Sequence, residues 1–241
     1  MDKIVKCPTI QYHKIDQPTP DVKIRGAYMA PRRFARQMSY LKRNRFSFYT
    51  ASEFVTFFTE NGHFPERGIC LTFDDGWKDN YTNAFPVLKE LGIKATIFLI
   101  PTCVGTITDR ATAEGEGPRE HLSEENIREM SASGIEFGSH SLNHKLFDRI
   151  EDAEIEEEVI ESKKSIENLL QKDCRVFAYP AGFYTPFAQS AIKSAGYIGA
   201  FTTIYGPEPE PDIYALNRSE ILRRYGRPFQ FPKRIKSIFN A

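Results

Sequence analysis

The stretch Gly68-Ile69-Cys70-Leu71-Thr72-Phe73, followed by Asp74-Asp75-Gly76, decides the fold class. Its first six residues carry no charge and are mostly apolar or β-branched, which is typical of a buried core strand. The strand then ends at two aspartates and a glycine turn. We therefore expect polar chemistry at the carboxyl end of a central strand.

Strand-like and helix-like patterns alternate on both sides of this stretch. Strands are expected over residues 4–13, 94–100, 135–139, 174–179, 198–203 and 215–221. Helices are expected over residues 31–43, 79–91, 123–133, 150–170 and 186–195, and a surface loop over 105–119. Such alternation predicts an α/β layer or barrel. Because 241 residues fall within the size of one barrel, one domain over residues 1–241 is expected.

The charge balance argues against nucleic acid and anionic membranes as partners. Lys plus Arg equals Asp plus Glu at 32 each, so no overall field draws the chain to nucleic acid or an anionic membrane. The basic ending is interspersed with Phe and Pro, and we interpret it as a solvated closing segment with no nucleic-acid role: Arg223, Arg224, Arg227, Lys233, Arg234 and Lys236.

The chain shows neither a targeting nor a redox pattern. No stretch of about 18 apolar residues could span a membrane, and the first residues lack an apolar leader. A secreted protein from which the leader has been removed would look the same, so location stays open. The four cysteines form no C-x-x-C pair and are expected as free or buried thiols, which favours a reducing compartment: Cys7, Cys70, Cys103 and Cys174.

Asp74 and Asp75 place two carboxylates side by side where a strand meets a turn. Two adjacent anions need a counter-charge, which a bound cation supplies, and they can then divide the work between metal ligation and proton transfer. The alternative is an ordinary Asp-Asp-Gly turn.

His140 and His144 make the metal interpretation stronger. They stand four residues apart after an expected strand, so both imidazoles can reach one ion. Together with one carboxylate they form a site with positions left for water and substrate. The alternative is a pair of surface histidines.

Three motifs together resemble a known family. Asp74-Asp75-Gly76, His140-Ser141-Leu142-Asn143-His144 and Phe177-Ala178-Tyr179-Pro180-Ala181-Gly182 occur in the order and approximate spacing of polysaccharide deacetylases with a NodB homology domain, carbohydrate esterase family 4. The likeness covers nearly the whole chain. It implies a distorted (β/α) barrel with seven or eight strands.

The resemblance also implies roles for individual residues. Asp75, His140 and His144 would bind a divalent metal, usually zinc, and Asp74 would be the general base. A backbone N–H in the loop from Tyr179 through Pro180 to Gly182 would stabilise the oxyanion. Cobalt, nickel, iron and manganese suit the same ligands.

The chain departs from the usual family pattern at two positions. No histidine follows His144, so the proton for the leaving amine is assigned to His13, as in the branch that includes biofilm poly-N-acetylglucosamine deacetylases. The alternative is a buried structural histidine. Ala178 replaces the arginine that steadies the catalytic aspartate in many members, and Arg218 could pair with Asp74 instead or with a surface carboxylate.

Aromatic residues near the motifs suggest sugar contacts. Trp77 and Tyr179 could line a groove, although aromatic residues are more often core. His63 and His121 are interpreted as surface residues.

The predicted function is removal of N-acetyl groups from an N-acetylated carbohydrate such as poly-N-acetylglucosamine, chitin or peptidoglycan. Hydrolysis of a small amide or a sugar nucleotide is the second enzyme hypothesis. A carbohydrate-binding relative without turnover is the third, and retention of Asp74, Asp75, His140 and His144 counts against it. The sequence leaves the oligomeric state open.

Overall fold

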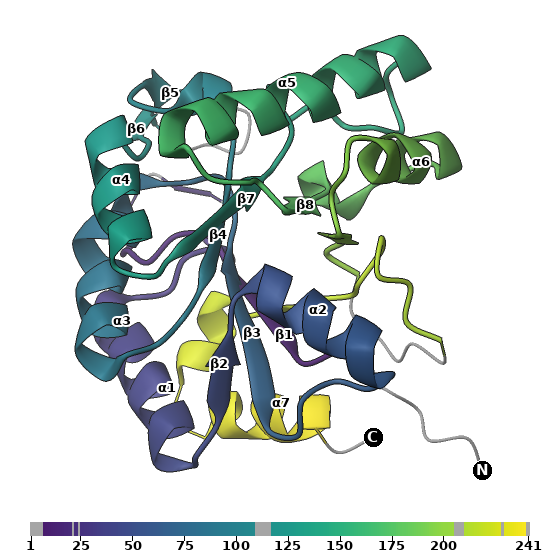
Figure 1. Cartoon of the computed structure of the whole chain (residues 1–241). Helices are drawn as coiled ribbons and strands as arrows, with labels where there is room; N and C mark the ends of the chain where they lie inside the picture. The colour runs from purple at the N-terminus through teal and green to yellow at the C-terminus, as the bar shows by residue number, and fades with distance from the viewer. Residues whose placement is uncertain are drawn as a thin grey trace.

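The computed structural model describes residues 7–20, 22–23, 25–108, 117–204, 210–227 and 229–239. Its main feature is an eight-stranded sheet in which all the paired strands are parallel. The order is β10 (Ser219–Glu220), β1 (Thr9–Tyr12), β3 (Gly68–Phe73), β4 (Thr96–Leu99), β7 (Glu136–Ser139), β8 (Val176–Ala178) and β9 (Gly199–Phe201), with β2 (Ser47–Tyr49) also paired to β3. The sheet curls into a half-barrel (Figure 1), which confirms the predicted barrel-like α/β class.

The segment between β9 and β10 connects the two edges of the curled sheet. Leu216 forms a parallel bridge with Phe201, and its N–H donates to the Ala200 carbonyl at 2.9 Å. Three residues later Ser219 enters the register of β1 opposite Ile10. Arg218 is therefore carried into the barrel interior, where its side chain is fully buried.

Helices pack around the sheet (Figure 1) and follow the predicted positions closely. α1 spans Pro31–Arg43, begins with a proline that suits the first helical turn, and buries Phe34, Met38 and Leu41. A capping box at Ser123 starts α4 (Glu124–Ala132). The others are α3 (Phe85–Leu91) after the π-helical turn η1 (Asn80–Ala84), α5 (Asp152–Leu170) and α6 (Pro186–Ser194).

One helix that the sequence did not reveal, α2 (Ala51–Asn61), covers the amino end of the barrel. Its first two N–H groups donate to the side chains of Thr96 and Glu136, the first residues of β4 and β7. It lies in front of the sheet in Figure 1. With the amino end covered, the carboxyl end is left for the site.

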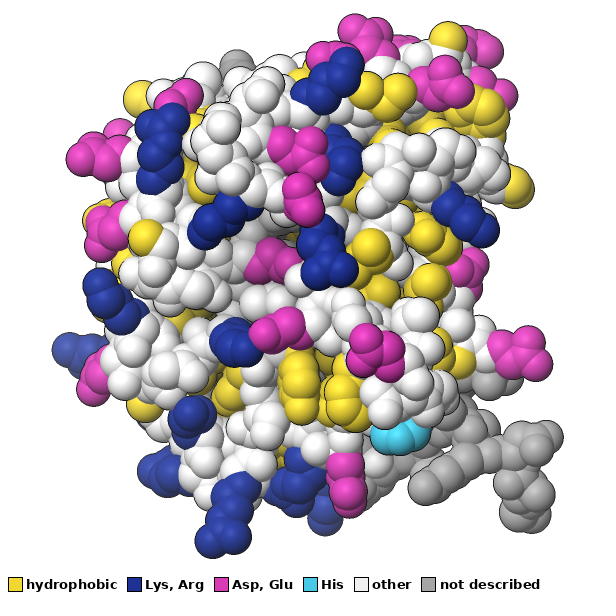
Figure 2. Space-filling view, viewed as in Figure 1, with side chains coloured by type: hydrophobic (Ala, Val, Ile, Leu, Met, Phe, Trp, Pro, Cys, Tyr) yellow, Lys and Arg dark blue, Asp and Glu magenta, His cyan; other side chains and the backbone are white. Residues whose placement is uncertain are grey.

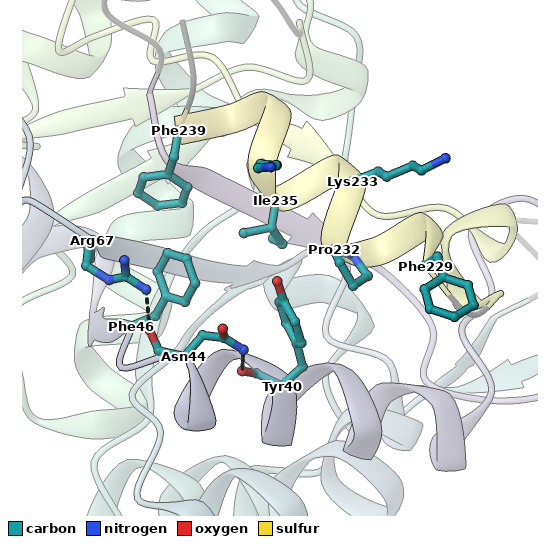
Figure 3. Close-up of a pocket in the computed structure, with 10 residues that line it drawn as sticks. Tyr40, Asn44, Phe46, Arg67, Phe229, Pro232, Lys233, Ile235 and Phe239 are labelled. Atoms are coloured by element: carbon teal, nitrogen blue, oxygen red, sulfur yellow. Dashed lines mark hydrogen bonds between the residues drawn. The ribbon is translucent and has the colours of Figure 1, made fainter.

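The prediction of a solvated closing segment is wrong. α7 (Gln230–Phe239) is amphipathic and buries Phe231, Ile235 and Ile238. It lies beside α1, and a groove of about 520 Å³ separates the two helices (Figure 3). The basic residues concealed the apolar spacing at 231, 235 and 238, which is helical.

Several other boundaries differ from expectation. The first strand begins at Thr9, and residues 1–6 lie outside the described residues. The expected loop over 105–119 contains β5 (Ile107–Thr108) at one end, and its other end pairs with it as β6 (Arg119–Glu120), whereas residues 109–116 are not described. Among the described residues no helix combines the length and apolar character needed to cross a bilayer.

We predict that Ile235→Ala destabilises the protein by about 2–5 kcal/mol, because it removes a side chain buried under α7 and leaves a cavity. The exposed neighbour Lys236→Ala serves as the control and should change stability by less than about 0.5 kcal/mol. Urea unfolding measures both. Equal effects of the two substitutions would show that α7 is not packed as described.

Candidate active site

The carboxyl ends of three parallel strands gather the predicted catalytic residues. Asp74 and Asp75 follow β3, His140 follows β7 and His13 follows β1. Because all these strands run in the same direction, their ends meet at one edge of the sheet.

Asp75, His140 and His144 form a compact cluster. One ligand atom from each lies within 4.8 Å of the others. The Asp75 Oδ1 atom is 3.7 Å from His140 Nε2 and 3.5 Å from His144 Nε2. Ligand atoms of a tetrahedral zinc lie about 3.4 Å apart, given bond lengths of about 2.1 Å. The three side chains therefore fit a divalent ion.

Hydrogen bonds orient two of these ligands. His140 Nδ1 lies 2.7 Å from the Ala178 carbonyl oxygen, to which it can donate only as the protonated nitrogen. This bond directs the unprotonated Nε2 toward the cluster. Trp77 Nε1 donates to Asp75 Oδ2 at 2.9 Å, so the other carboxylate oxygen faces the histidines.

The backbone at the cluster adopts an unusual conformation. Asp75, Ser141 and His144 have φ angles of 73°, 61° and 60°, in the left-handed region that non-glycine residues seldom occupy. The Ser141 hydroxyl accepts the His144 N–H at 2.9 Å and holds the second turn in place. Such strain is typical of functional sites.

Asp74 is buried in a tight network at the centre of the barrel. Arg218 NH1 donates to its Oδ1 and NH2 to its Oδ2, both at 2.7 Å, which is a bidentate pair. Gln11 Nε2 donates to Oδ2 at 2.6 Å. Gln11 was not assigned a role from the sequence, although it precedes His13 by two residues and so shares its face of the strand.

The surroundings of the two aspartates keep both ionised. Burial acts to raise the pKa of Asp74, but the Arg218 guanidinium, with His140 where that imidazole is protonated, outweighs it and leaves the pKa below its usual value. Burial also acts to raise the pKa of Asp75, and His144, His13 and His140 outweigh it in the same way. A carboxylate that is ionised at neutral pH suits both a metal ligand and a proton acceptor.

His13 lies at the edge of the same site. It lies near enough to both aspartates for its protonated form to lower their pKa, and its Nδ1 is 3.7 Å from Glu220 Oε1. Asn80 Nδ2 donates to the His13 carbonyl at 2.9 Å, and the Ile15 N–H donates to Asp79 Oδ1 at 2.7 Å. The start of η1 therefore fixes the segment that carries His13, a role that the sequence did not reveal.

The third motif, residues 177–182, uses most of its backbone N–H groups for internal hydrogen bonds. The Tyr179 N–H donates to the Phe201 carbonyl and the Gly182 N–H to the Tyr179 carbonyl, both at 2.9 Å. Pro180 has no N–H. The expectation of an oxyanion donor in the loop from Tyr179 to Gly182 is therefore narrowed within that loop, because neither the Tyr179 nor the Gly182 N–H is available. Among the described residues the Ala181 N–H is the one N–H between residues 179 and 182 that has no protein acceptor.

The prediction that Trp77 and Tyr179 contact the sugar is not supported by the burial of their rings. Tyr179 is fully buried, and its hydroxyl donates to the Tyr214 carbonyl at 2.9 Å. Trp77 is 3% exposed, with Lys14 Nζ 4.6 Å from its ring centroid and the His121 ring 4.2 Å away. The faces of both rings are covered, so neither can stack on a sugar.

His121 is not the surface residue that we expected. It is 4% exposed, and its Nδ1 lies 3.0 Å from the Asp75 carbonyl oxygen. Its place beside β6 and on the Trp77 ring supports the loop that carries the metal-ligand candidate Asp75. His63 is exposed as expected.

Comparisons with known proteins agree with this geometry. The family model "Polysaccharide deacetylase" matches residues 61–200. "Putative polysaccharide deacetylase YxkH" of Bacillus subtilis is 29% identical over 91% of this chain and 73% of its own length. The poly-β-1,6-N-acetyl-D-glucosamine N-deacetylase of Staphylococcus aureus is 29% identical over 72% of this chain and 60% of its own length.

A solved structure extends the likeness to the fold. The Streptococcus pyogenes deacetylase PplD, in complex with acetate, superimposes with a TM-score of 0.82 over 99% of this chain and all of its own, at 25% identity.

The chain belongs to the polysaccharide deacetylase family. It is accordingly a hydrolase of carbon–nitrogen bonds in carbohydrates, as the sequence predicted. The family is in general metal-dependent, and Asp75, His140 and His144 offer a site for the ion.

We predict that Gly182→Ala destabilises the protein by about 3 kcal/mol. Gly182 has a φ of +77°, and an added Cβ would lie 2.5 Å from the backbone nitrogen of Thr203. Gly62→Ala is the control, because Gly62 has a similar φ of +71° with nothing within 4 Å. The control should lose about 1 kcal/mol of stability, because its left-handed backbone conformation disfavours alanine but the added Cβ meets no other atom. Equal losses in urea unfolding would refute the close contact.

A second prediction concerns Asp79. Burial raises its pKa to about 6, against the partial compensation of the Ile15 N–H and Arg119. The folded state therefore binds this proton more tightly than the unfolded chain, and its contribution to stability is lost as the pH rises from about 4 to about 6.

Asp79→Asn should remove this contribution. Between pH 4 and pH 7, the free energy of unfolding of the wild type should fall by about 3 kcal/mol relative to that of the variant, as measured by urea unfolding. Asn retains an oxygen for the Ile15 N–H, and the exposed Asp173→Asn is the matched control. A pH-independent difference would contradict the raised pKa.

Proposed function

We propose that the chain hydrolyses N-acetyl groups of an N-acetylated carbohydrate polymer, with Asp75, His140 and His144 holding a divalent ion. The observation that carries the proposal is the approach of two imidazole Nε2 atoms to one Asp75 oxygen at 3.5 and 3.7 Å, beside the buried Asp74. Two imidazoles and a carboxylate suit zinc, and cobalt, nickel, iron and manganese are accepted by the same ligands. When bound, such an ion acidifies water and polarises a carbonyl oxygen.

Asp74 is the proposed general base. Its two oxygens are held by Arg218 and Gln11, so the carboxylate cannot rotate away from the water that attacks the acetamide carbonyl. The ion pair with Arg218 favours the ionised form that accepts this proton. Arg218 acts through Asp74 and is a positioning residue.

His13 is the proposed general acid, and Ala181 the proposed oxyanion donor. As the carbon–nitrogen bond breaks, the amine takes a proton, and His13 is a histidine near both aspartates that does not belong to the cluster of Asp75, His140 and His144. The Ala181 N–H faces no protein acceptor among the described residues and can bind the developing oxyanion. The products are acetate and the free amine of the sugar.

Poly-N-acetylglucosamine is the substrate class that we propose first. The support is the 29% identity to the Staphylococcus aureus deacetylase over most of this chain. We also propose that residues 1–241 form a single domain. In support, the site combines His13, near the start of the sequence, with Arg218, near its end.

We predict that Asp74→Asn lowers kcat for acetate release from N-acetylglucosamine oligomers by about 10²–10⁴-fold, because it removes the proton acceptor. Asp173→Asn, an exposed residue, makes the same chemical change and should leave kcat unaltered. Zinc content measured by atomic absorption should stay the same in Asp74→Asn and fall in His144→Gln.

Two outcomes would overturn the proposal. One is an absence of acetate release by zinc-loaded wild-type protein from every N-acetylated oligomer tested. The other is an Asp74→Asn variant as active as the wild type.

A further inference from the structure

Positive charge is concentrated on one part of this electrically neutral chain. Residues 25–52 and 221–241 contain 13 of the 32 Lys and Arg residues and no Asp or Glu. The two segments pack together: Gln37 Nε2 donates to the Tyr225 carbonyl at 3.1 Å, and the Arg223 N–H donates to the Gly26 carbonyl at 2.8 Å. Lys and Arg side chains gather along the lower part of the face in Figure 2, where α1 and α7 lie in Figure 1.

Within this region one cavity is lined by arginine almost alone. It has a volume of about 410 Å³, and its lining consists of Arg25, Gly26, Arg33, Arg223, Arg224 and Arg227. No carboxylate lines it, and none of these five arginines forms an ion pair among the described residues.

Contacts with the backbone hold two of these arginines in place. Arg25 donates from Nε to the Val22 carbonyl at 2.8 Å and from NH2 to the Pro20 carbonyl at 2.5 Å. The Arg33 side chain lies against Gly226, where an added Cβ would be 2.6 Å from Arg33 Cδ. The cavity is therefore built by the fold, at the cost of repulsion between like charges.

Such an arrangement fits a phosphate group. A guanidinium presents a planar fork that binds anionic oxygens in pairs. A carboxylate offers two oxygens and is satisfied by one or two forks, whereas a phosphate ester offers more oxygens and can engage several. Five guanidiniums around one cavity therefore match a phosphate ester better than a carboxylate.

The cavity lies at the catalytic end of the sheet. Arg223 follows β10 after two residues, and β10 ends at Glu220, whose carboxylate is 3.7 Å from His13. Three residues of extended chain cover at most about 11 Å, which limits how far the Arg223 backbone lies from that of Glu220, the residue beside His13. Arg25 and Gly26 come from the loop that starts at His13.

We propose that this cavity binds a phosphate ester carried by the carbohydrate substrate, next to the N-acetylated sugar at the catalytic site. The inference rests on the proposed function and specifies its substrate as an anionic, phosphate-bearing glycan. Arg223 and Arg227, which are exposed and donate no side-chain hydrogen bond among the described residues, are the specificity residues.

The test compares two oligomers with the full-length, zinc-loaded protein. One is a neutral N-acetylglucosamine tetramer, and the other is the same tetramer with a phosphate monoester on one sugar. Arg223→Gln/Arg227→Gln should raise KM for the phosphorylated oligomer by about tenfold or more, with kcat and the neutral oligomer unaffected. The effect should shrink at high salt.

Lys42→Gln/Arg43→Gln is the matched control. It removes the same charge from the exposed far end of α1, about 15 Å along the helix from Arg33, and should change neither KM. Equal effects of the two double variants, or no effect of the first, would overturn the proposal.

Two further results separate the alternatives. In the first, the wild type shows no preference for the phosphorylated oligomer but binds phosphatidylglycerol vesicles. If Arg223→Gln/Arg227→Gln then loses vesicle binding, the cavity serves a membrane and the proposal is wrong. If neither oligomer is hydrolysed, the proposed function fails. Calorimetric binding of the phosphorylated tetramer then still tests the cavity, since its loss in the first double variant supports the phosphate site and its retention refutes it.

Discussion

The bidentate pair between Arg218 and Asp74 is the interaction on which the site depends. Both side chains are fully buried in the barrel, and neither could stay charged there without the other. The pair also ties the last strand of the sheet to the central one, because Arg218 precedes β10 and Asp74 follows β3. Loss of either charge would leave the other unpaired in the interior, which costs about 3–5 kcal/mol.

The remaining geometry follows from parallel strands and a few strained residues. Parallel pairing brings the ends of β1, β3 and β7 to one edge, and α2 occupies the opposite end. Left-handed backbone at Asp75 and His144 then turns these side chains toward His140. The two neighbouring aspartates thereby receive different surroundings, with Asp74 held by Arg218 and Asp75 by Trp77 and the histidines.

The sequence predicted the sheet and the polar cluster because both are encoded locally. β3 is a continuous apolar run, and the Asp and His motifs follow strands directly. Contacts between distant segments were harder to foresee. Gln11 reaches Asp74 only through the pairing of β1 with β3, and Trp77 is buried only because His121 and Lys14 cover it. Helices α2 and α7 were missed because short apolar spacings were masked by polar or basic neighbours.

The connection between the two edges of the sheet has a consequence for the order in which the protein is assembled. A chain grows from its amino end, so the cluster of Asp75, His140 and His144 is synthesised well before Arg218. Until Arg218 arrives, the carboxylate of Asp74 has no guanidinium partner and the barrel interior holds an uncompensated negative charge. The network around Asp74 is therefore completed only after Arg218 has been synthesised, later than the ligand cluster on the neighbouring strand ends.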